Sequence, residues 1–79
     1  MNNKQKLFQA VADVFHVDSA TVSEASSQDT IPKWDSLGII NLVTELEQVF
    51  GVQFEILEIA DFRNVAIIKS ILTEKGVRF

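Results

Sequence analysis

The chain has 79 residues, 47% of them hydrophobic, and a formal net charge of −4. A chain of this length forms one small domain with a modest core. It contains no cysteine, which excludes a disulfide framework, a thiolate metal site and a catalytic cysteine. The N-terminus is polar and no apolar run approaches about 18 residues, so we expect no signal peptide, no membrane span and a cytoplasmic protein.

The charges are unevenly distributed along the chain. No lysine or arginine lies between Lys33 and Arg63, whereas that interval holds six carboxylates: Asp35, Glu45, Glu47, Glu55, Glu58 and Asp61. An acidic surface of this kind attracts basic partner proteins and repels a phosphate backbone. We therefore expect protein partners and no nucleic acid.

The first element is an amphipathic helix over residues 4–15. Leu7, Val11, Val14 and Phe15 recur at helical spacing, and Asn2 or Asn3 can cap the start. His16 follows at the C-terminal end, where an imidazole suits the helix dipole. Because no second ligand or nucleophile accompanies this histidine, we assign it a structural role and expect no metal site.

Residues 17–35 form a long connection that is rich in small polar residues and contains the only proline, Pro32. A short helical turn is possible over residues 19–23. Four apolar side chains can anchor the connection to the helices, namely Val17, Val22, Ile31 and Trp34.

The clearest element is a helix over Ser36–Phe50 that Gly51 ends in the left-handed conformation. Helical spacing places six apolar residues on its inward face: Ile39, Leu42, Val43, Leu46, Val49 and Phe50. Leu37 falls on the opposite face, so we expect it to be exposed.

Residues 52–56 alternate like a strand, but one strand has no partner in this chain, so we predict an ordered loop. A short helix over residues 57–62 follows, and Asn64 caps a last helix over residues 65–75 with Gly76 at its end. Its inward residues are Val65, Ile68, Ile71 and Leu72. The predicted fold class is all-α, a small four-helix bundle. It has three main helices, a short third one and a long loop between the first two, in one domain over residues 1–79.

Ser36 lacks the residues that would make it a catalytic nucleophile. The single histidine is distant in sequence, and no lysine is positioned to activate the hydroxyl. The chain also lacks a paired general acid and base and a phosphate-binding glycine loop. We therefore expect no independent enzymatic activity and infer that another protein acts on Ser36.

The segment Trp34-Asp35-Ser36-Leu37-Gly38, at the head of the apolar helix, resembles the attachment site of acyl carrier proteins. Asp35-Ser36 alone is a common helix start. However, the domain length, the position of the motif and the run from Leu37 to Phe50 followed by Gly51-Val52 strengthen the resemblance, which extends over nearly the whole chain. It implies that a phosphopantetheinyl transferase, with magnesium, attaches 4′-phosphopantetheine to Ser36. It also implies that Asp35 both caps the helix and helps to position the arm.

The resemblance further implies a function. The protein would carry acyl groups as thioesters and present them to acyl-loading and acyl-transferring enzymes of fatty-acid, polyketide or related lipid biosynthesis. Enzymes with basic patches would dock on Leu37, Asn41, Glu45 and Glu47. An aliphatic chain would lie between the second and last helices, against Ile59, Phe62 and Ile68. We expect the carrier to be a monomer.

Two positions depart from the pattern of primary fatty-acid synthesis. Those carriers usually have an acidic residue directly after Asp-Ser-Leu and another three positions later, where this chain has Gly38 and Asn41. The departure favours a specialised stand-alone carrier. A D-alanyl or aminoacyl carrier stays open, because D-alanyl carriers also place glycine shortly after the serine. A helical protein-interaction module without any modification is the alternative from a different class.

Overall fold

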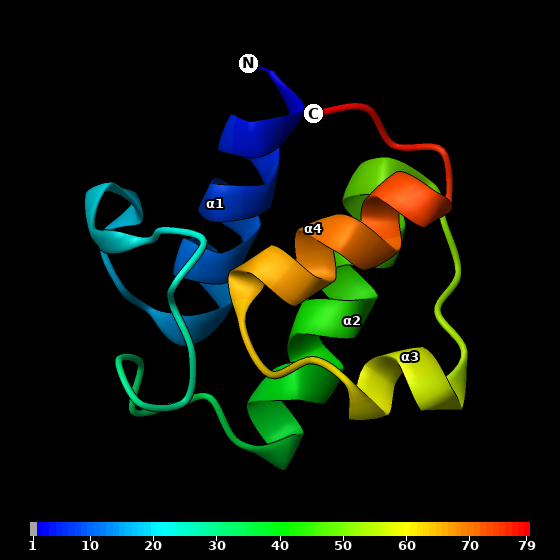
Figure 1. The fold of residues 1–79 in the computed structure, drawn as a ribbon. Coiled ribbons are helices and arrows are strands. Elements are labelled where there is room, and N and C mark those ends of the chain that lie inside the picture. The colour runs from blue at the N-terminus through cyan, green and yellow to red at the C-terminus, as the bar shows by residue number, and fades with distance from the viewer. Residues whose placement is uncertain (1) are drawn as a thin grey trace.

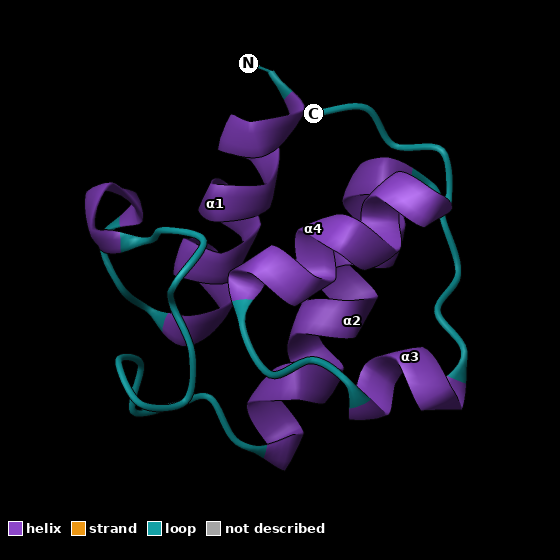
Figure 2. Cartoon of the chain, viewed as in Figure 1, coloured by secondary structure: helices purple, strands orange, loops and turns teal. Residues whose placement is uncertain are grey.

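A computed structural model describes residues 2–79 and shows a compact, all-helical molecule, which confirms the predicted all-α class (Figure 1). The helices are α1 (Asn3–Phe15), α2 (Ser36–Phe50), α3 (Ile56–Ala60) and α4 (Val65–Glu74), and one turn of 3₁₀ helix spans Ser19–Thr21. Residues 2–79 contain no strand (Figure 2). A single isolated bridge in this range pairs Ser27 with Asn64. No helix in this range is both long and apolar enough to cross a membrane.

Side-chain caps set where the three long helices begin. Asn2 forms a capping box with Gln5 at the start of α1. Asp35 accepts from the N–H of Gly38 at the start of α2, and Asn64 accepts from the N–H of Ile67 at the start of α4. These bonds satisfy N–H groups that a helix leaves without intrahelical partners. The predicted caps are therefore confirmed.

Helix α3 lies slightly earlier in the chain than the sequence predicts. A capping box between Glu55 and Glu58 begins it at Ile56, and Asp61 has already left helical geometry. The helix therefore ends at Ala60, before residue 62. The 3₁₀ turn is likewise shorter than the predicted residues 19–23, because Val22 is extended.

The core lies where α1, α2 and α4 meet, and the inward face predicted for α4 is confirmed. The largest fully buried side chains are Phe15, Phe62, Leu7, Leu42, Leu46, Ile68, Leu72, Val11 and Val65. The prediction for Val49 is wrong, since this side chain is 40% exposed. It lies at the edge of the seam between α1 and α2, in a hollow shared with Lys6 and Ala10, where no further element covers it.

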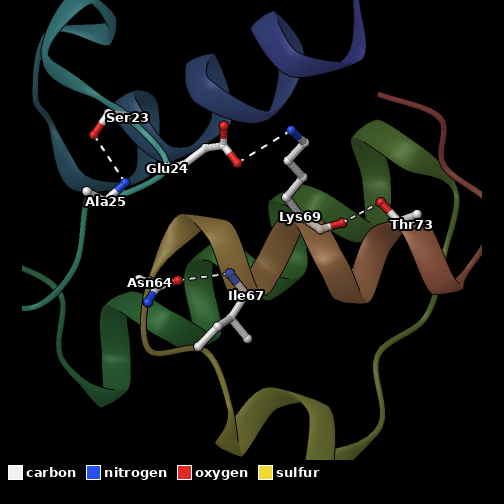
Figure 3. Close-up of polar contacts among 7 residues, drawn as sticks. All are labelled: Ser23, Glu24, Ala25, Asn64, Ile67, Lys69 and Thr73. Carbon is white, nitrogen blue, oxygen red and sulfur yellow. Dashed lines mark hydrogen bonds and ion pairs between the residues drawn. The ribbon is translucent and has the colours of Figure 1, made fainter.

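The connection between α1 and α2 is held against α4 by its backbone as well as by its buried side chains. The carbonyls of Ser26 and Glu24 accept from the N–H groups of Val65 and Ala66 at 3.0 and 2.9 Å. The Glu24 carboxylate also pairs with Lys69 at 3.4 Å (Figure 3). The connection thus supplies acceptors to the first turn of α4, which explains why a long polar segment is ordered here.

Both chain termini lie at one end of the molecule, and α2 begins at the opposite end (Figure 1). A hydrogen bond from the Asn3 side chain to the Arg78 carbonyl, 2.8 Å long, joins the two terminal segments. The start of α2, which carries the candidate attachment residue, is therefore remote from the termini.

Candidate functional site

Trp34 fixes the start of α2 to the rest of the molecule. Its side chain is buried, and its ring stacks on that of Phe15 with centroids 5.1 Å apart and planes 13° apart. Its indole Nε1 donates a 3.1 Å hydrogen bond to the Phe62 carbonyl. The residue therefore joins α1, the segment before α4 and the beginning of α2. The backbone that leads into Ser36 is held from two sides.

Asp35 and Ser36 form an ordered, open helix start. Asp35 Oδ1 accepts from the N–H of Gly38 at 2.8 Å, as the sequence predicts. Ser36 is the first residue of α2 and is exposed. Within residues 2–79 its hydroxyl has no hydrogen-bond partner, and neither do the N–H groups of Ser36 and Leu37. A free hydroxyl beside unpaired helix N–H groups suits a phosphate ester, because helix N-termini attract anions.

Gly38 packs closely beneath this helix start. A Cβ atom at residue 38 would fall on the Lys33 carbonyl oxygen and 2.6 Å from Cε1 of Phe15. No side chain fits there without moving the backbone or the buried aromatic ring. The identity of Gly38 therefore has a packing explanation. Consequently, its departure from the fatty-acid carrier pattern is no evidence for a change of partner.

The predicted docking residues all lie on α2, but their surroundings differ. Leu37 is 71% exposed, which confirms its expected exposure, and Asn41 is exposed as well. Glu45 and Glu47 are half-buried, and Glu47 Oε2 accepts from the backbone N–H of Phe54 at 3.0 Å. Glu47 thus has a structural contact of its own, whereas the other three side chains are free to meet a partner.

Three further apolar side chains are exposed near these elements, and the sequence interpretation did not single them out. Ile40 is 59% exposed and lies one helical turn after Ser36. Ile56 and Leu57 are 83% and 84% exposed on α3, a helix with no buried residue. The spacing from Ser36 could have indicated Ile40. The exposure of the two α3 residues depends on how that short helix packs.

The three residues expected to line an acyl-chain pocket lie in the hydrophobic core or pack against it. Phe62 and Ile68 are buried, and Ile59 is half-buried. None of the three lines the groove of about 540 Å³ that the structure shows between α3 and α4. That groove is formed by Leu57, Glu58, Asp61, Asn64, Ala66, Ile67, Ser70, Ile71 and Glu74. The pocket at these residues stays a prediction.

Basic residues from α4 and the preceding segment neutralise part of the acidic surface. Glu58 pairs with Lys75 at 2.7 Å, and Asp61 pairs with Arg63 at 2.9 Å. The pKa of Glu58 is lowered, first by the hydrogen bond from the Glu55 backbone N–H and then by Lys75. Among the described residues, the other four carboxylates of that interval make no ion pair, namely Asp35, Glu45, Glu47 and Glu55. The unpaired charge thus lies along α2 and directly before α3.

In comparisons with known proteins, no family model matches the chain and no curated protein is similar enough to count as a relative. The functional argument therefore depends on the geometry around Ser36.

Proposed function

We propose that this protein is an acyl carrier that bears 4′-phosphopantetheine on Ser36. The observation that carries the proposal is the exposed, unbonded Ser36 hydroxyl at the first position of a rigidly held helix. The order of the four helices and the long connection before α2 support the same assignment, since they suit the small bundle of that family.

The residues around Ser36 have distinct roles in this proposal. Trp34 holds the approach to α2, and Asp35 caps the helix so that its remaining N–H groups face the phosphate. The Ser36 oxygen would form the new bond to the pantetheine-bearing phosphorus of coenzyme A, while the pyrophosphate P–O bond breaks, adenosine 3′,5′-bisphosphate leaves and the serine proton passes to a base of the transferase. The attached group supplies a thiol that holds the cargo as a thioester. The chain itself presents the cargo by tethering, which raises its effective concentration at partner enzymes.

The partners follow from the surface around this helix start. A transferase and acyl-loading or acyl-transferring enzymes with basic patches would meet Leu37, Asn41 and Glu45, with the exposed Ile40 as a further apolar contact. Basic patches steer association toward unpaired carboxylates. We place this carrier in the cytoplasm, as a monomer that visits successive enzymes of lipid, polyketide or related biosynthesis.

Incubation of the folded protein with a broad-specificity phosphopantetheinyl transferase, coenzyme A and magnesium tests the proposal. The intact mass of the wild type should rise by one phosphopantetheine. The control variant Ser70→Ala, which removes an exposed serine of α4, should show the same increase. Ser36→Ala should stay unmodified and keep its helical content, because Asp35 still caps α2. A wild-type mass that does not change would exclude the carrier function.

The exposed apolar pair Leu37 and Ile40 also suits a helical interaction module that needs no prosthetic group. The two functions differ in their dependence on Ser36. A module of this kind would bind its partner equally well after Ser36→Ala, and protein isolated from its native cell would have the unmodified mass. For a carrier, the same mass measurement identifies the cargo and separates acyl from D-alanyl or other aminoacyl groups.

A further inference from the structure

We propose that a surface hollow between the end of α1 and the start of α2 binds the phosphopantetheine arm, with His16 and Lys33 as two of the residues that hold it. The inference rests on the proposed function, which attaches the arm to Ser36 beside this hollow. It concerns where the arm lies between visits to partner enzymes. It also gives His16 a binding role where the sequence predicts a structural one.

The hollow has a volume of about 310 Å³ and reaches both sequence neighbours of Ser36. Its lining residues are Val14, Phe15, His16, Lys33, Asp35, Leu37, Gly38 and Asn41. Asp35 and Leu37 directly flank Ser36, and consecutive Cα atoms lie only about 3.8 Å apart. An arm attached to Ser36 therefore begins next to the hollow, and tethering gives it an effective concentration there of about millimolar.

The residues around the hollow match the chemistry of the arm. Val14 and Leu37 can meet the methyl groups of the pantetheine, and the Asn41 amide can hydrogen-bond to its amide and hydroxyl groups. Lys33 supplies a cation for the phosphodiester. Ligand sites typically combine apolar walls with a few polar groups of this kind.

Lys33 is available for a contact with the phosphate. Its side chain is exposed, and it makes no ion pair among the described residues. Lys69 and Lys75, in contrast, pair with the carboxylates of Glu24 and Glu58. The cation that lies three positions before Ser36 is therefore one that no carboxylate of residues 2–79 neutralises.

His16 adopts a backbone conformation that favours a different residue. It ends α1 with a φ of 56°, in the left-handed region where helices usually place glycine. Among residues 2–79 it is the only non-glycine residue with a positive φ. Backbone strain of this kind is often found at functional positions. In our proposal the imidazole offsets the strain, because it lines the hollow and can hydrogen-bond to the arm.

Binding of the arm and docking of a partner would use the same side chains. Leu37 and Asn41 line the hollow and also belong to the predicted docking surface. A partner enzyme that covers these two residues would displace the arm. The cargo would thus be held against the end of α1 between encounters and released as the partner docks.

NMR spectroscopy of the loaded protein tests the inference. Isotope-labelled protein would be loaded by a broad-specificity transferase with unlabelled coenzyme A, so that isotope-filtered NOE spectra show contacts between the arm and the protein. We expect cross-peaks from the arm to the side chains of Val14, His16 and Leu37. Cross-peaks confined to Ser36 or to other faces of α2 would overturn the inference. A protein whose mass does not change on loading would contradict the proposed function instead.

Lys33→Gln tests the charged contact. Loss of an exposed ion pair with the phosphate should lower the ratio of bound to free arm by about 1.4- to 5-fold, measured from the cross-peaks to Leu37. Lys4→Gln is the matched control, because it removes an exposed lysine near the start of α1, at the opposite end of the molecule (Figure 1). Equal cross-peaks in the two variants would exclude Lys33 from the site.

His16→Gly separates binding from a structural role. Glycine adopts the left-handed conformation without strain, so the variant should unfold at a urea concentration no lower than that of the wild type. The cross-peaks between the arm and Leu37 should nevertheless weaken, because the imidazole is gone. Cross-peaks of wild-type intensity in His16→Gly would show that this histidine does not hold the arm.

Discussion

The indole nitrogen of Trp34 donates a buried hydrogen bond to the carbonyl of Phe62, 28 positions later in the chain. The bond joins the residue that precedes the helix start at Asp35 to the segment that precedes α4. The geometry of the candidate attachment site is thus set by a contact between two connecting segments, supported by the stack of Trp34 on Phe15.

Trp34→Phe should keep most of the stacking but leave the Phe62 carbonyl without its donor. Loss of a buried hydrogen bond that leaves one partner unsatisfied costs about 1–3 kcal/mol. Urea unfolding should show this loss for Trp34→Phe and about 3–5 kcal/mol for Trp34→Ala, which also leaves a cavity. If Trp34→Phe and the wild type unfold at the same urea concentration, the hydrogen bond from Trp34 to the Phe62 carbonyl contributes nothing to stability.

Asp35 has two proposed roles that a pair of variants can separate. Asn is as good an N-cap as Asp, so Asp35→Asn should unfold within about 0.5 kcal/mol of the wild type, whereas Asp35→Ala should lose about 1 kcal/mol. If the carboxylate also takes part in transfer of the arm, the initial loading rate should fall in both variants. Full-rate loading of Asp35→Asn would limit this residue to capping.

Gly38→Ala tests whether packing determines the identity of this residue. The added Cβ meets the Lys33 carbonyl and the Phe15 ring, and overpacking of a well-filled site costs about 1–3 kcal/mol. Asn41→Ala is the matched control on the same helix, where an exposed substitution should change the free energy of unfolding by less than about 0.5 kcal/mol. Equal stabilities of the two variants would contradict the packing explanation.

Asn41 is the better position at which to test partner choice, because it is exposed and free of close packing. Asn41→Glu restores one carboxylate of the fatty-acid carrier pattern. An exposed ion pair contributes about 0.2–1 kcal/mol, so turnover with a housekeeping condensing enzyme should rise by about 1.4- to 5-fold at low salt. The gain should shrink at high salt because screening weakens the pair. Unchanged turnover at low salt would remove Asn41 as a determinant of partner choice.

Glu58 makes the free energy of unfolding depend on pH in the acidic range. Its pKa is lowered in the folded protein, mainly by the Glu55 N–H and next by Lys75, so the charged carboxylate stabilises the fold above its ordinary pKa of about 4.5. This stabilisation is lost as the pH falls through the lower folded pKa. Glu58→Gln should therefore be less stable than the wild type near neutral pH, and the difference should shrink in acid. A difference that stays constant down to pH about 2 would contradict this linkage.

Glu74→Gln is the control for that titration. Glu74 lies on α4 and, like Glu58 on α3, lines the groove, but it makes no ion pair among the described residues. As an exposed surface substitution, Glu74→Gln should change the free energy of unfolding near neutral pH by less than about 0.5 kcal/mol.

Local rules in the sequence determine where most elements begin and end. Asp35 and Asn64 are capping residues at the head of apolar helical runs, and Gly51 ends α2 with a φ of 65°. These are interactions over three or four residues, so a pattern in one dimension reveals them. The same spacing predicts that Leu37 is exposed, and it places Ser36 at the first position of a helix.

Only the tertiary structure decides what surrounds those positions. From the sequence alone, Gly38 is interpreted as the loss of a docking carboxylate. The structure shows that the Lys33 carbonyl and the Phe15 ring occupy the space that a side chain at this position would need. The apolar character of Phe62 is visible in the sequence, but only the structure shows that its ring is buried and packs edge-to-face on Phe54. Such contacts join residues that are far apart in sequence, and their geometry depends on how the connecting segments fold. Helical periodicity records which face of a helix is apolar, but not which side chain fills the space opposite.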